Sequence, residues 1–232
     1  MRAVPPKSVP SREAWWANDP SAWIRSETRI SRPSLTPELR LHLVTSTCPL
    51  WNVREDELLE MGLPDPYWAF AWPGGQAIAR HVLDHPELVA GRTVLDLGSG
   101  SGIAAIAAGM RGATVVAADI DPLASIAAEM NAELNGVSIE ARRDDLLELG
   151  AECGAYDVIL AADVLYDDEL AARVSRFLDA RAASSLILLG DPGRGRVPAR
   201  LELIAEYDAP DDVDPGDGAI RRRTCVYRYR AP

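Results

Sequence analysis

The stretch V-L-D-L-G-S-G-S-G, residues 94–102, decides the fold of this chain. A short apolar run of strand type passes directly into three alternating glycines, and an alanine-rich run over residues 103–110 then has the composition of a helix. Gly98, Gly100 and Gly102 let the backbone come close to a ligand where a Cβ atom would collide. The stretch therefore predicts a strand, a ligand-binding loop and a helix, in that order.

Strand and helix patterns alternate along the chain beyond Pro66. The predicted strands cover residues 93–97, 113–118, 138–142, 156–161 and 186–189, and the predicted helices cover residues 103–110, 122–135 and 169–182. Such alternation is typical of a parallel sheet with helices on both faces. Residues 201–207 and 224–228 break the rhythm and predict a C-terminal antiparallel hairpin. The predicted fold class is therefore α/β and Rossmann-like, with a mostly parallel sheet.

The segment before this region carries signals of helices. Thr36 and Pro37 are residue types preferred at an N-cap and at the first helical position, and leucines follow them, so residues 36–44 predict a helix. A second short helix is expected over residues 54–61. We therefore divide the chain into a flexible lead-in, an N-terminal helical extension and a ligand-binding domain, over residues 1–22, 23–66 and 67–232.

The composition is that of a folded protein, with 47% hydrophobic and 25% charged residues. The formal net charge of −11 opposes binding to a phosphate backbone, which requires a basic surface. No secretory signal and no apolar run of about 18 residues is present, and three separate cysteines form neither a disulfide framework nor a metal pair. We therefore expect a cytoplasmic monomer that contacts neither nucleic acid nor membrane and holds no metal.

A carboxylate follows the second predicted strand. Asp119 stands 21 residues beyond Gly98, where an acid at a strand end accepts hydrogen bonds from ribose hydroxyls. Asp121 is either its neighbour in the site or the N-cap of the next helix. The spacing G-x-G-x-G differs from the nicotinamide fingerprint G-x-G-x-x-G/A, because Ile103 stands where the fingerprint has glycine or alanine.

The third predicted strand is followed by R-R-D-D-L-L. In methyltransferases an acid here accepts from the adenine amino group and the next apolar residue covers the ring, which points to Asp145 and Leu146. Either aspartate also suits a helix cap, and Asp144 is interpreted as one. Together these features favour S-adenosylmethionine, with S-adenosylhomocysteine as product. The expected cofactor-binding residues of this set are Gly98, Ser99, Gly100, Gly102, Asp119, Ile120, Asp145, Leu146 and Ala162.

Several longer motifs are more particular than the glycine loop. They are P-E-L-R-L-H-L from Pro37, P-L-W from Pro49, P-Y-W-A-F-A-W-P-G-G-Q-A from Pro66, A-D-I-D-P from Ala118, A-D-V-L-Y-D from Ala162 and G-D-P-G-R from Gly190. With these motifs the chain resembles, from about residue 23 to 228, the lysine methyltransferases of the electron transfer flavoprotein β-subunit, a family of class I seven-β-strand protein methyltransferases. The resemblance implies the seven-stranded methyltransferase fold and protein-lysine N-methylation of that β-subunit.

The resemblance also implies site residues in the aromatic segment that precedes Pro73-Gly74-Gly75, which is interpreted as a turn. Trp72 and Gln76 would border the cofactor, and Trp68 and Trp72 would contact the substrate. An aromatic ring attracts a sulfonium or an ammonium by roughly 0.5 to 2 kcal/mol. Alternatively, Trp68, Phe70 and Trp72 only pack a helix on the sheet, which is the interpretation preferred for Phe70.

In the D-x-x-Y motif, Asp163 would hold the lysine nitrogen and Tyr166 would wall the channel, so these are the expected catalytic residues. Asp163 alternatively caps a helix. The reacting amine must be neutral, which costs about 4 to 5 kcal/mol at pH 7 for a pKa near 10.4, and a nearby carboxylate raises that pKa. Asp163 is therefore expected to orient the amine rather than to act as a strong base.

Asp191 and Arg194 either contact the protein substrate or form a salt-bridged turn. His42, His81 and His85 lie outside the strand ends and are expected to be structural.

The alternatives to the main hypothesis are a ribosomal-protein or other protein methyltransferase and a small-molecule amine N-methyltransferase. More distant ones are a non-catalytic cofactor-binding module and a nicotinamide oxidoreductase.

Overall fold

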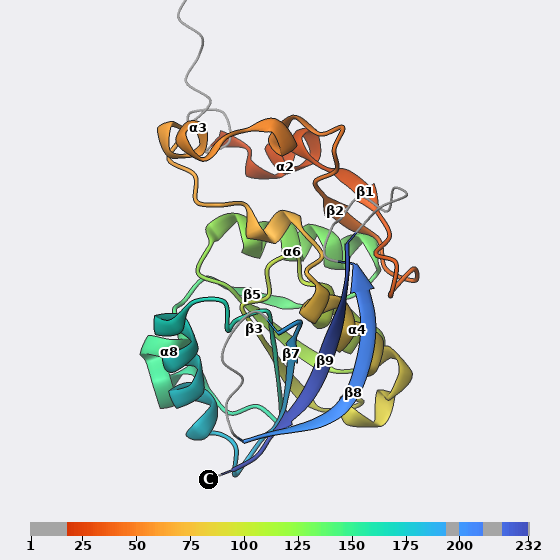
Figure 1. The fold of residues 1–232 in the computed structure, drawn as a ribbon, viewed down its shortest axis with the longest axis vertical. Helices are drawn as coiled ribbons and strands as arrows, with labels where there is room; N and C mark the ends of the chain where they lie inside the picture. The colour runs from red at the N-terminus through yellow and green to blue at the C-terminus, as the bar shows by residue number, and fades with distance from the viewer. Residues whose placement is uncertain (1–17, 194–199, 211–219, 232) are drawn as a thin grey trace, which may run out of the picture.

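The computed structural model describes residues 18–193, 200–210 and 220–231 (Figure 1). Residues 1–17 of the predicted lead-in, Arg194 and residues 211–219 of the aspartate-rich loop lie outside the described residues. Helix α2 (Pro20–Glu27) begins inside the segment expected to be a flexible lead-in, with Asp19 as its N-cap.

Seven strands form one sheet in the order β5-β4-β3-β6-β7-β9-β8. The first five along the chain run parallel, and β9 lies antiparallel to both β7 and β8. The bounds are β3 Thr93–Leu97, β4 Thr114–Ala118, β5 Glu140–Arg142, β6 Val158–Ala162, β7 Leu186–Asp191, β8 Leu201–Pro210 and β9 Arg221–Tyr229. The predicted parallel sheet with a C-terminal hairpin is confirmed.

The central strands are buried on both faces, so successive side chains enter two different cores. Val94 of β3 and Leu160 of β6 pack on one face, whereas Leu95 and Ile159 pack on the other. The first core includes α4 (Pro73–Asp84) and α5 (Ile103–Met110), and the second includes α7 (Leu146–Leu149) and α8 (Asp168–Asp179). Because β4 and β6 lie on either side of β3, the chain reverses its winding direction at β3.

The segment Pro73-Gly74-Gly75 is not a turn but the first turn of α4, with Pro73 at the start of the helix. The two glycines allow α4 to approach the sheet closely. A Cβ atom on Gly74 would meet the Gly190 carbonyl oxygen and would lie 2.5 Å from Asp163 Oδ2. A Cβ atom on Gly190 would lie 2.5 Å from the Gly74 carbonyl oxygen. Backbone therefore packs on backbone where α4 meets β7.

The N-terminal elements form a separate layer that packs on α6 (Pro122–Leu134) beyond the sheet (Figure 1). Besides α2 they are β1 Arg29–Ser31, β2 Leu41–Leu43, the 3-10 helices η1 Pro49–Asn52 and η2 Tyr67–Ala69, and α3 Glu55–Glu60. Their core includes Trp23, Ile24 and Trp68, which pack with Leu123 and Ala127 of α6. Two more 3-10 helices, η3 Pro86–Leu88 and η4 Gly150–Cys153, lie in the main part.

The helix predicted over residues 36–44 is wrong. This segment contains a turn and then β2, which pairs with β1 in an antiparallel two-stranded sheet. Leu39, Leu41 and Leu43 are all buried and recur every second residue, which is the period of a strand. The short helix predicted over residues 54–61 is confirmed as α3. Among the described residues, no helix is both long and apolar enough to span a membrane.

Replacing Gly190 by alanine should destabilise the fold by about 1 to 3 kcal/mol, because the new methyl group meets backbone atoms that cannot move independently. Gly109→Ala is the comparison variant. Its methyl group would lie 2.3 Å from Val137 Cγ1, but a partly buried side chain can move away where backbone cannot, and alanine gains about 1 kcal/mol of helix propensity. Urea unfolding measures the free energy of unfolding of both variants. Equal stabilities of the two variants would contradict the close-packing argument.

Candidate functional site

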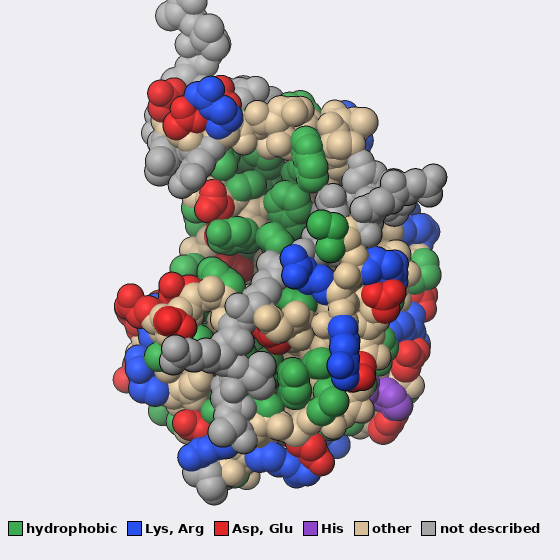
Figure 2. All heavy atoms as spheres, in the orientation of Figure 1, with side chains coloured by type: hydrophobic (Ala, Val, Ile, Leu, Met, Phe, Trp, Pro, Cys, Tyr) green, Lys and Arg blue, Asp and Glu red, His purple; other side chains and the backbone are tan. Residues whose placement is uncertain are grey.

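A cavity of about 600 Å³ opens at the carboxyl ends of β3, β4 and β6, next to the point where the winding direction changes. In Figure 2, hydrophobic side chains line a hollow between the N-terminal layer and α8, and acidic side chains show within it. The walls come from four parts of the chain: the segment before α4, the strand ends, the start of α6, and residues of α7 and α8. This is the place that parallel α/β folds use for ligands.

The glycine loop forms one wall of the cavity. Gly98, Gly100 and Gly102 have φ values of 69°, 50° and 77°, a region that residues with a Cβ atom rarely adopt. Gly98 and Gly100 line the cavity. Gly102 instead serves as the left-handed N-cap of α5, and a Cβ atom there would lie 3.0 Å from the Ala128 side chain. The third glycine therefore packs α5 against α6.

Asp119 lies at the end of β4 and is tied to this loop. Its Oδ2 accepts from Gly100 N at 2.9 Å and its Oδ1 from Asp121 N at 3.0 Å. Burial raises the pKa of Asp119, while the N–H groups of Asp121, Gly100 and Ile120 act in the opposite direction. A carboxylate has about four acceptor positions, so three backbone bonds leave room for a ligand hydroxyl.

Apolar surface flanks this carboxylate. Ile120 is 69% exposed although it lines the cavity, and Leu146 faces the same space from the start of α7. An isoleucine this exposed inside a cavity gains contact area when a ligand covers it. Ile120 and Leu146 therefore suit a flat apolar part of a ligand that lies beside Asp119.

The aspartates around the cavity divide into different structural roles. Asp121 is the N-cap of α6, as one of the two interpretations expected. Asp145 is the N-cap of α7 and bonds Arg173 at 2.5 Å. Asp144, which was expected to be a cap, pairs with Arg142 at 2.8 Å instead. Asp145 still lines the cavity beside Leu146, so its capping role and a contact with a ligand are compatible.

Asp163 follows β6 and is held by the backbone of two other elements. Its N–H donates to Gly190 O at 2.9 Å, and its Oδ2 accepts from Gly75 N in the first turn of α4 at 3.0 Å. The positive end of the α4 dipole therefore faces this carboxylate. Asp163 has a φ of 55°, the one positive value among described non-glycine residues. Strained backbone of this kind is frequent at functional sites.

Aromatic rings stand at the mouth of the cavity next to Asp163. Tyr67 lies 5.9 Å from Trp72 and 5.8 Å from Tyr166, measured between ring centroids. The Tyr67 hydroxyl donates to Asp65 Oδ2 at 3.3 Å. Burial raises the pKa of Tyr166, and the nearby Asp119, Asp167 and Asp65 raise it further. The mouth thus combines ring faces with negative charge, an environment that favours a cation.

Most of the residues predicted for the site line this one cavity. They are Trp68, Trp72, Gly98, Gly100, Asp119, Ile120, Asp145, Leu146, Ala162, Asp163 and Tyr166. None of the three histidines is among the lining residues that the structure describes, and His42 and His81 bond Thr28 and Tyr207 instead.

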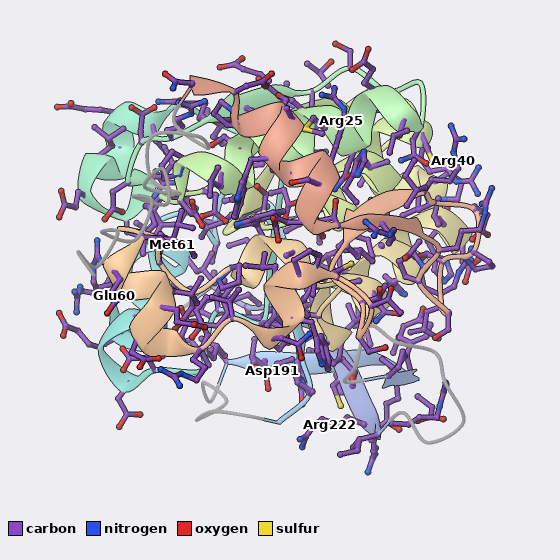
Figure 3. All side chains as sticks on the ribbon, turned by 90° about the horizontal axis from the view of Figure 1, so that it is seen from above. Arg25, Arg40, Glu60, Met61, Asp191 and Arg222 are labelled. Carbon is purple, nitrogen blue, oxygen red and sulfur yellow. The ribbon has the colours of Figure 1, made fainter. Side chains whose placement is uncertain are left out.

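Four predicted residues lie elsewhere. Gln76 is buried in α4 and donates to the Ala71 carbonyl oxygen at 2.7 Å, so it braces the segment before the helix. Ser99 is buried behind the glycine loop, and Gly102 packs on α6 as described. Asp191, labelled in Figure 3, is buried at the end of β7 beside β9 and accepts from Gly193 N at 2.6 Å. A side chain so enclosed does not reach a protein substrate, and Arg194 lies outside the described residues.

Sequence reasoning missed several residues that line the cavity: Pro64, Asp65, Tyr67, Val164, Leu170, Arg173 and Val174. The signal for Tyr67 was present, because it belongs to the aromatic segment beside residues that were selected, and Asp65 lies directly before that segment. No local pattern indicates Arg173, since it reaches the site only through the packing of α8 against α7.

Known proteins similar to this chain settle its family. A sequence profile of the ribosomal protein L11 methyltransferases (PrmA) matches residues 80–186. The electron transfer flavoprotein beta subunit lysine methyltransferase of Danio rerio is 41% identical over 209 residues, covering 86% of this chain and 79% of that protein. The Homo sapiens protein of that name is 41% identical over 196 residues, covering 80% and 73%. The chain belongs to this lysine methyltransferase family.

This methyltransferase also shares its fold with solved structures of the class. The crystal structure of magnesium protoporphyrin IX methyltransferase (ChlM) from Synechocystis PCC 6803 with bound SAM superposes with a TM-score of 0.50 at 17% identity. The match covers 78% of this chain and 88% of that chain. At this identity the likeness concerns the fold, which is the Rossmann-like class I methyltransferase fold.

Asp96 is a fully buried carboxylate of the methyltransferase, in β3 just before the glycine loop. Its Oδ2 accepts from Ala105 N at 3.0 Å, and burial raises the pKa of Asp96 to about 7 from 3.8. The folded state therefore holds this proton more tightly than the unfolded state does. The resulting stabilisation is complete below pH 3.8 and is lost as the pH rises to about 7.

Asp96→Asn keeps an acceptor for Ala105 N but removes the ionisation. The variant should gain stability relative to the wild type as the pH rises from 4 to 8, by up to about 4 kcal/mol because a tenfold change in an ionisation constant is worth about 1.4 kcal/mol. Urea unfolding at a series of pH values measures the difference. A difference that does not change with pH would show that Asp96 is not the titrating group.

Proposed function

We propose that this methyltransferase uses S-adenosylmethionine to methylate a lysine side chain on the β-subunit of electron transfer flavoprotein. The observation that supports this most directly is the combination of two kinds of lining in one cavity. Glycines and the Asp119 carboxylate form the first group, and Asp163 with aromatic rings forms the second. A cofactor and a cationic side chain thus find matching chemistry within one space.

The first group of lining residues fits the cofactor. Gly98 and Gly100 leave backbone exposed to the cavity, and Asp119 retains acceptor capacity for a ribose hydroxyl. Ile120 and Leu146 would enclose the adenine ring, with Asp145 beside its amino group, while Trp72 and Ala162 border the remaining length. When bound, the cofactor supplies an electrophilic methyl group on a sulfonium, and S-adenosylhomocysteine is what remains after transfer.

Asp163 orients the acceptor amine in this proposal. Its carboxylate accepts from Gly75 N at the positive end of α4, which holds it in one geometry. A fixed carboxylate aligns an amine by accepting its N–H, but it also raises the amine's pKa. Removal of the amine proton therefore falls to bulk water, helped by the partly buried surroundings that disfavour a charged amine. Tyr166 and Trp72 wall the path along which the amine enters.

The identity of the protein substrate comes from the relatives, whose names specify the electron transfer flavoprotein beta subunit. A ribosomal protein is the second candidate, because the family profile that matches residues 80–186 is that of the ribosomal protein L11 methyltransferases. A small-molecule amine is the third. The three candidates differ in where a transferred methyl group ends up.

The test is transfer of a radiolabelled methyl group from S-adenosylmethionine into an extract of cells that lack the enzyme, followed by mass spectrometry of the labelled product. Label on a lysine of the flavoprotein β-subunit is expected. Asp163→Asn should lower turnover by roughly 100-fold through misalignment of the amine. It should leave cofactor affinity within about threefold, because asparagine tolerates a positive φ and still accepts from Gly75 N.

Label on another protein would show that the substrate assignment is wrong, and label only on small molecules would exclude a protein methyltransferase. Full activity of Asp163→Asn would contradict the orienting role. Cofactor affinity is measured separately by calorimetry, so that a loss of binding is not mistaken for a loss of alignment.

A further inference from the structure

Five aromatic rings form a continuous row outside and across the mouth of the cavity. Neighbouring ring centroids are 6.4 Å apart for Trp51 and Phe70, 5.4 Å for Phe70 and Trp72, 5.9 Å for Trp72 and Tyr67, and 5.8 Å for Tyr67 and Tyr166. We call this row the aromatic strip. It joins η1, η2 and the loop after β6, which are far apart in the sequence.

The outer part of the strip is not explained by the cavity. Trp51 and Phe70 do not belong to the cavity lining described above, and Trp51 is 39% exposed. Tyr166, at the inner end, is 53% exposed. Contiguous exposed aromatic surface is typical of sites where another protein binds, and tryptophan is enriched among the residues that dominate such binding. The cavity therefore does not explain Trp51 of the P-L-W motif, whereas a protein-binding surface does.

Acidic residues stand close in the chain to several rings of the strip. Asp65 accepts from the Tyr67 hydroxyl, and Asp167 lies next to Tyr166 in the chain. The exposed Asp56, Glu57 and Glu60 follow Trp51 on α3, where Arg54 is already paired with Asp56. A partner that covers Tyr67 and Tyr166 therefore meets the carboxylates of Asp65 and Asp167, which favours lysine and arginine side chains.

We propose that the aromatic strip is the docking surface for the polypeptide segment that flanks the target lysine, with Trp51 as its outer anchor. The segment is basic, and its target lysine enters the cavity past Tyr166 while its neighbouring residues cover the rings outward to Trp51. This inference rests on the proposed function as a protein methyltransferase but not on which protein is the acceptor.

Trp51→Ala tests the strip. It should raise the KM for the intact acceptor protein about tenfold or more, with kcat and the cofactor dissociation constant within about twofold of wild type, because Trp51 touches neither the cavity nor the reacting groups. Trp51→Phe should recover most of the affinity. Met110→Ala is the matched control, since Met110 is 40% exposed but ends α5, which returns the chain to the amino end of β4, away from the cavity.

The acceptor in these assays is the protein that takes up label in the extract experiment. An unchanged KM for Trp51→Ala, or an equal effect of Met110→Ala, would overturn the docking proposal while leaving the proposed function intact. Label on small molecules alone would overturn both. A wild-type enzyme that labels a protein other than the flavoprotein β-subunit would change the proposed substrate, and the Trp51 comparison would be made on that protein.

A separate observation concerns the buried amide of Asn131 on α6. Its Oδ1 accepts from His42 N of β2 at 2.7 Å, and its Nδ2 donates to the Ser101 carbonyl oxygen at 2.9 Å. Asn135, one helical turn later, accepts from Arg40 N at 2.9 Å and donates to Arg40 O at 2.7 Å. The two asparagines thus bond the edge of β2, but among their described bonds only those of Asn131 reach the glycine loop.

Ser101 lies between Gly100 and Gly102, which both have positive φ values. A loop in this conformation costs more chain entropy than a regular element and needs a partner that selects it. We infer that Asn131 is a positioning residue that holds the glycine loop in its binding geometry and links it to the N-terminal layer. Loss of its amide should therefore weaken cofactor binding, although Asn131 does not line the cavity.

Asn131→Ala and Asn135→Ala provide the comparison. Both loosen β2, so both should lower the melting temperature, but only Asn131→Ala should raise the dissociation constant for S-adenosylhomocysteine in calorimetry, by about tenfold. If Asn131→Ala does not fold, Asn131→Ser, which leaves a small polar side chain, gives the same measurement. Wild-type affinity in the Asn131 variant, or equal weakening by Asn135→Ala, would overturn the inference.

Discussion

The contact between the start of α4 and the ends of β6 and β7 is the constraint on which the rest of the site depends. Gly74 and Gly190 bring two backbones together, and the Gly75 N–H then reaches the Asp163 carboxylate at 3.0 Å. A methyl group at either glycine would separate the helix from the sheet. The helix that orients Asp163 is also the helix that begins directly after Trp72, so the same contact sets the distance between the carboxylate and the aromatic rings.

The two principal carboxylates of the site have different surroundings. Asp163 is fixed at the positive end of a helix, which favours its charged form. Asp119 is bonded to backbone amides as well, but burial dominates and raises its pKa. Asp96 lies deeper, and its pKa reaches about 7. Burial therefore makes a negative charge costly at Asp119 and at Asp96, whereas the rings and acidic residues around Tyr166 favour a cation there.

The sequence allowed accurate prediction wherever one local rule acted alone. The strand-glycine-helix unit around Gly98 and the alternation after it follow from hydrophobic period and glycine spacing, and β3 and α5 have the predicted bounds. The prediction of a helix over residues 36–44 was wrong because it relied on the N-cap signal at Thr36. The leucines of this segment recur every second residue, as in a strand, and β2 pairs with β1. The placement of Gln76 and Asp191 could not be predicted, because the bonds they make with Ala71 O and Gly193 N depend on backbone positions that no sequence pattern contains.

The N-terminal layer and the sheet contribute different parts of one site, and this division has a consequence for specificity. The glycine loop and Asp119 belong to the α/β part, whereas Trp51, Tyr67 and Trp68 belong to the layer that packs on α6. Substitutions in the N-terminal layer change the surface that an acceptor protein contacts. The backbone at the strand ends, which would hold the cofactor, is not altered by them. The layers are nevertheless coupled, because α6 bonds β2 on one side and the glycine loop on the other through a single asparagine. Substitutions in the N-terminal layer are therefore expected to be compatible with cofactor binding only where they preserve the hydrogen bond between β2 and Asn131 of α6.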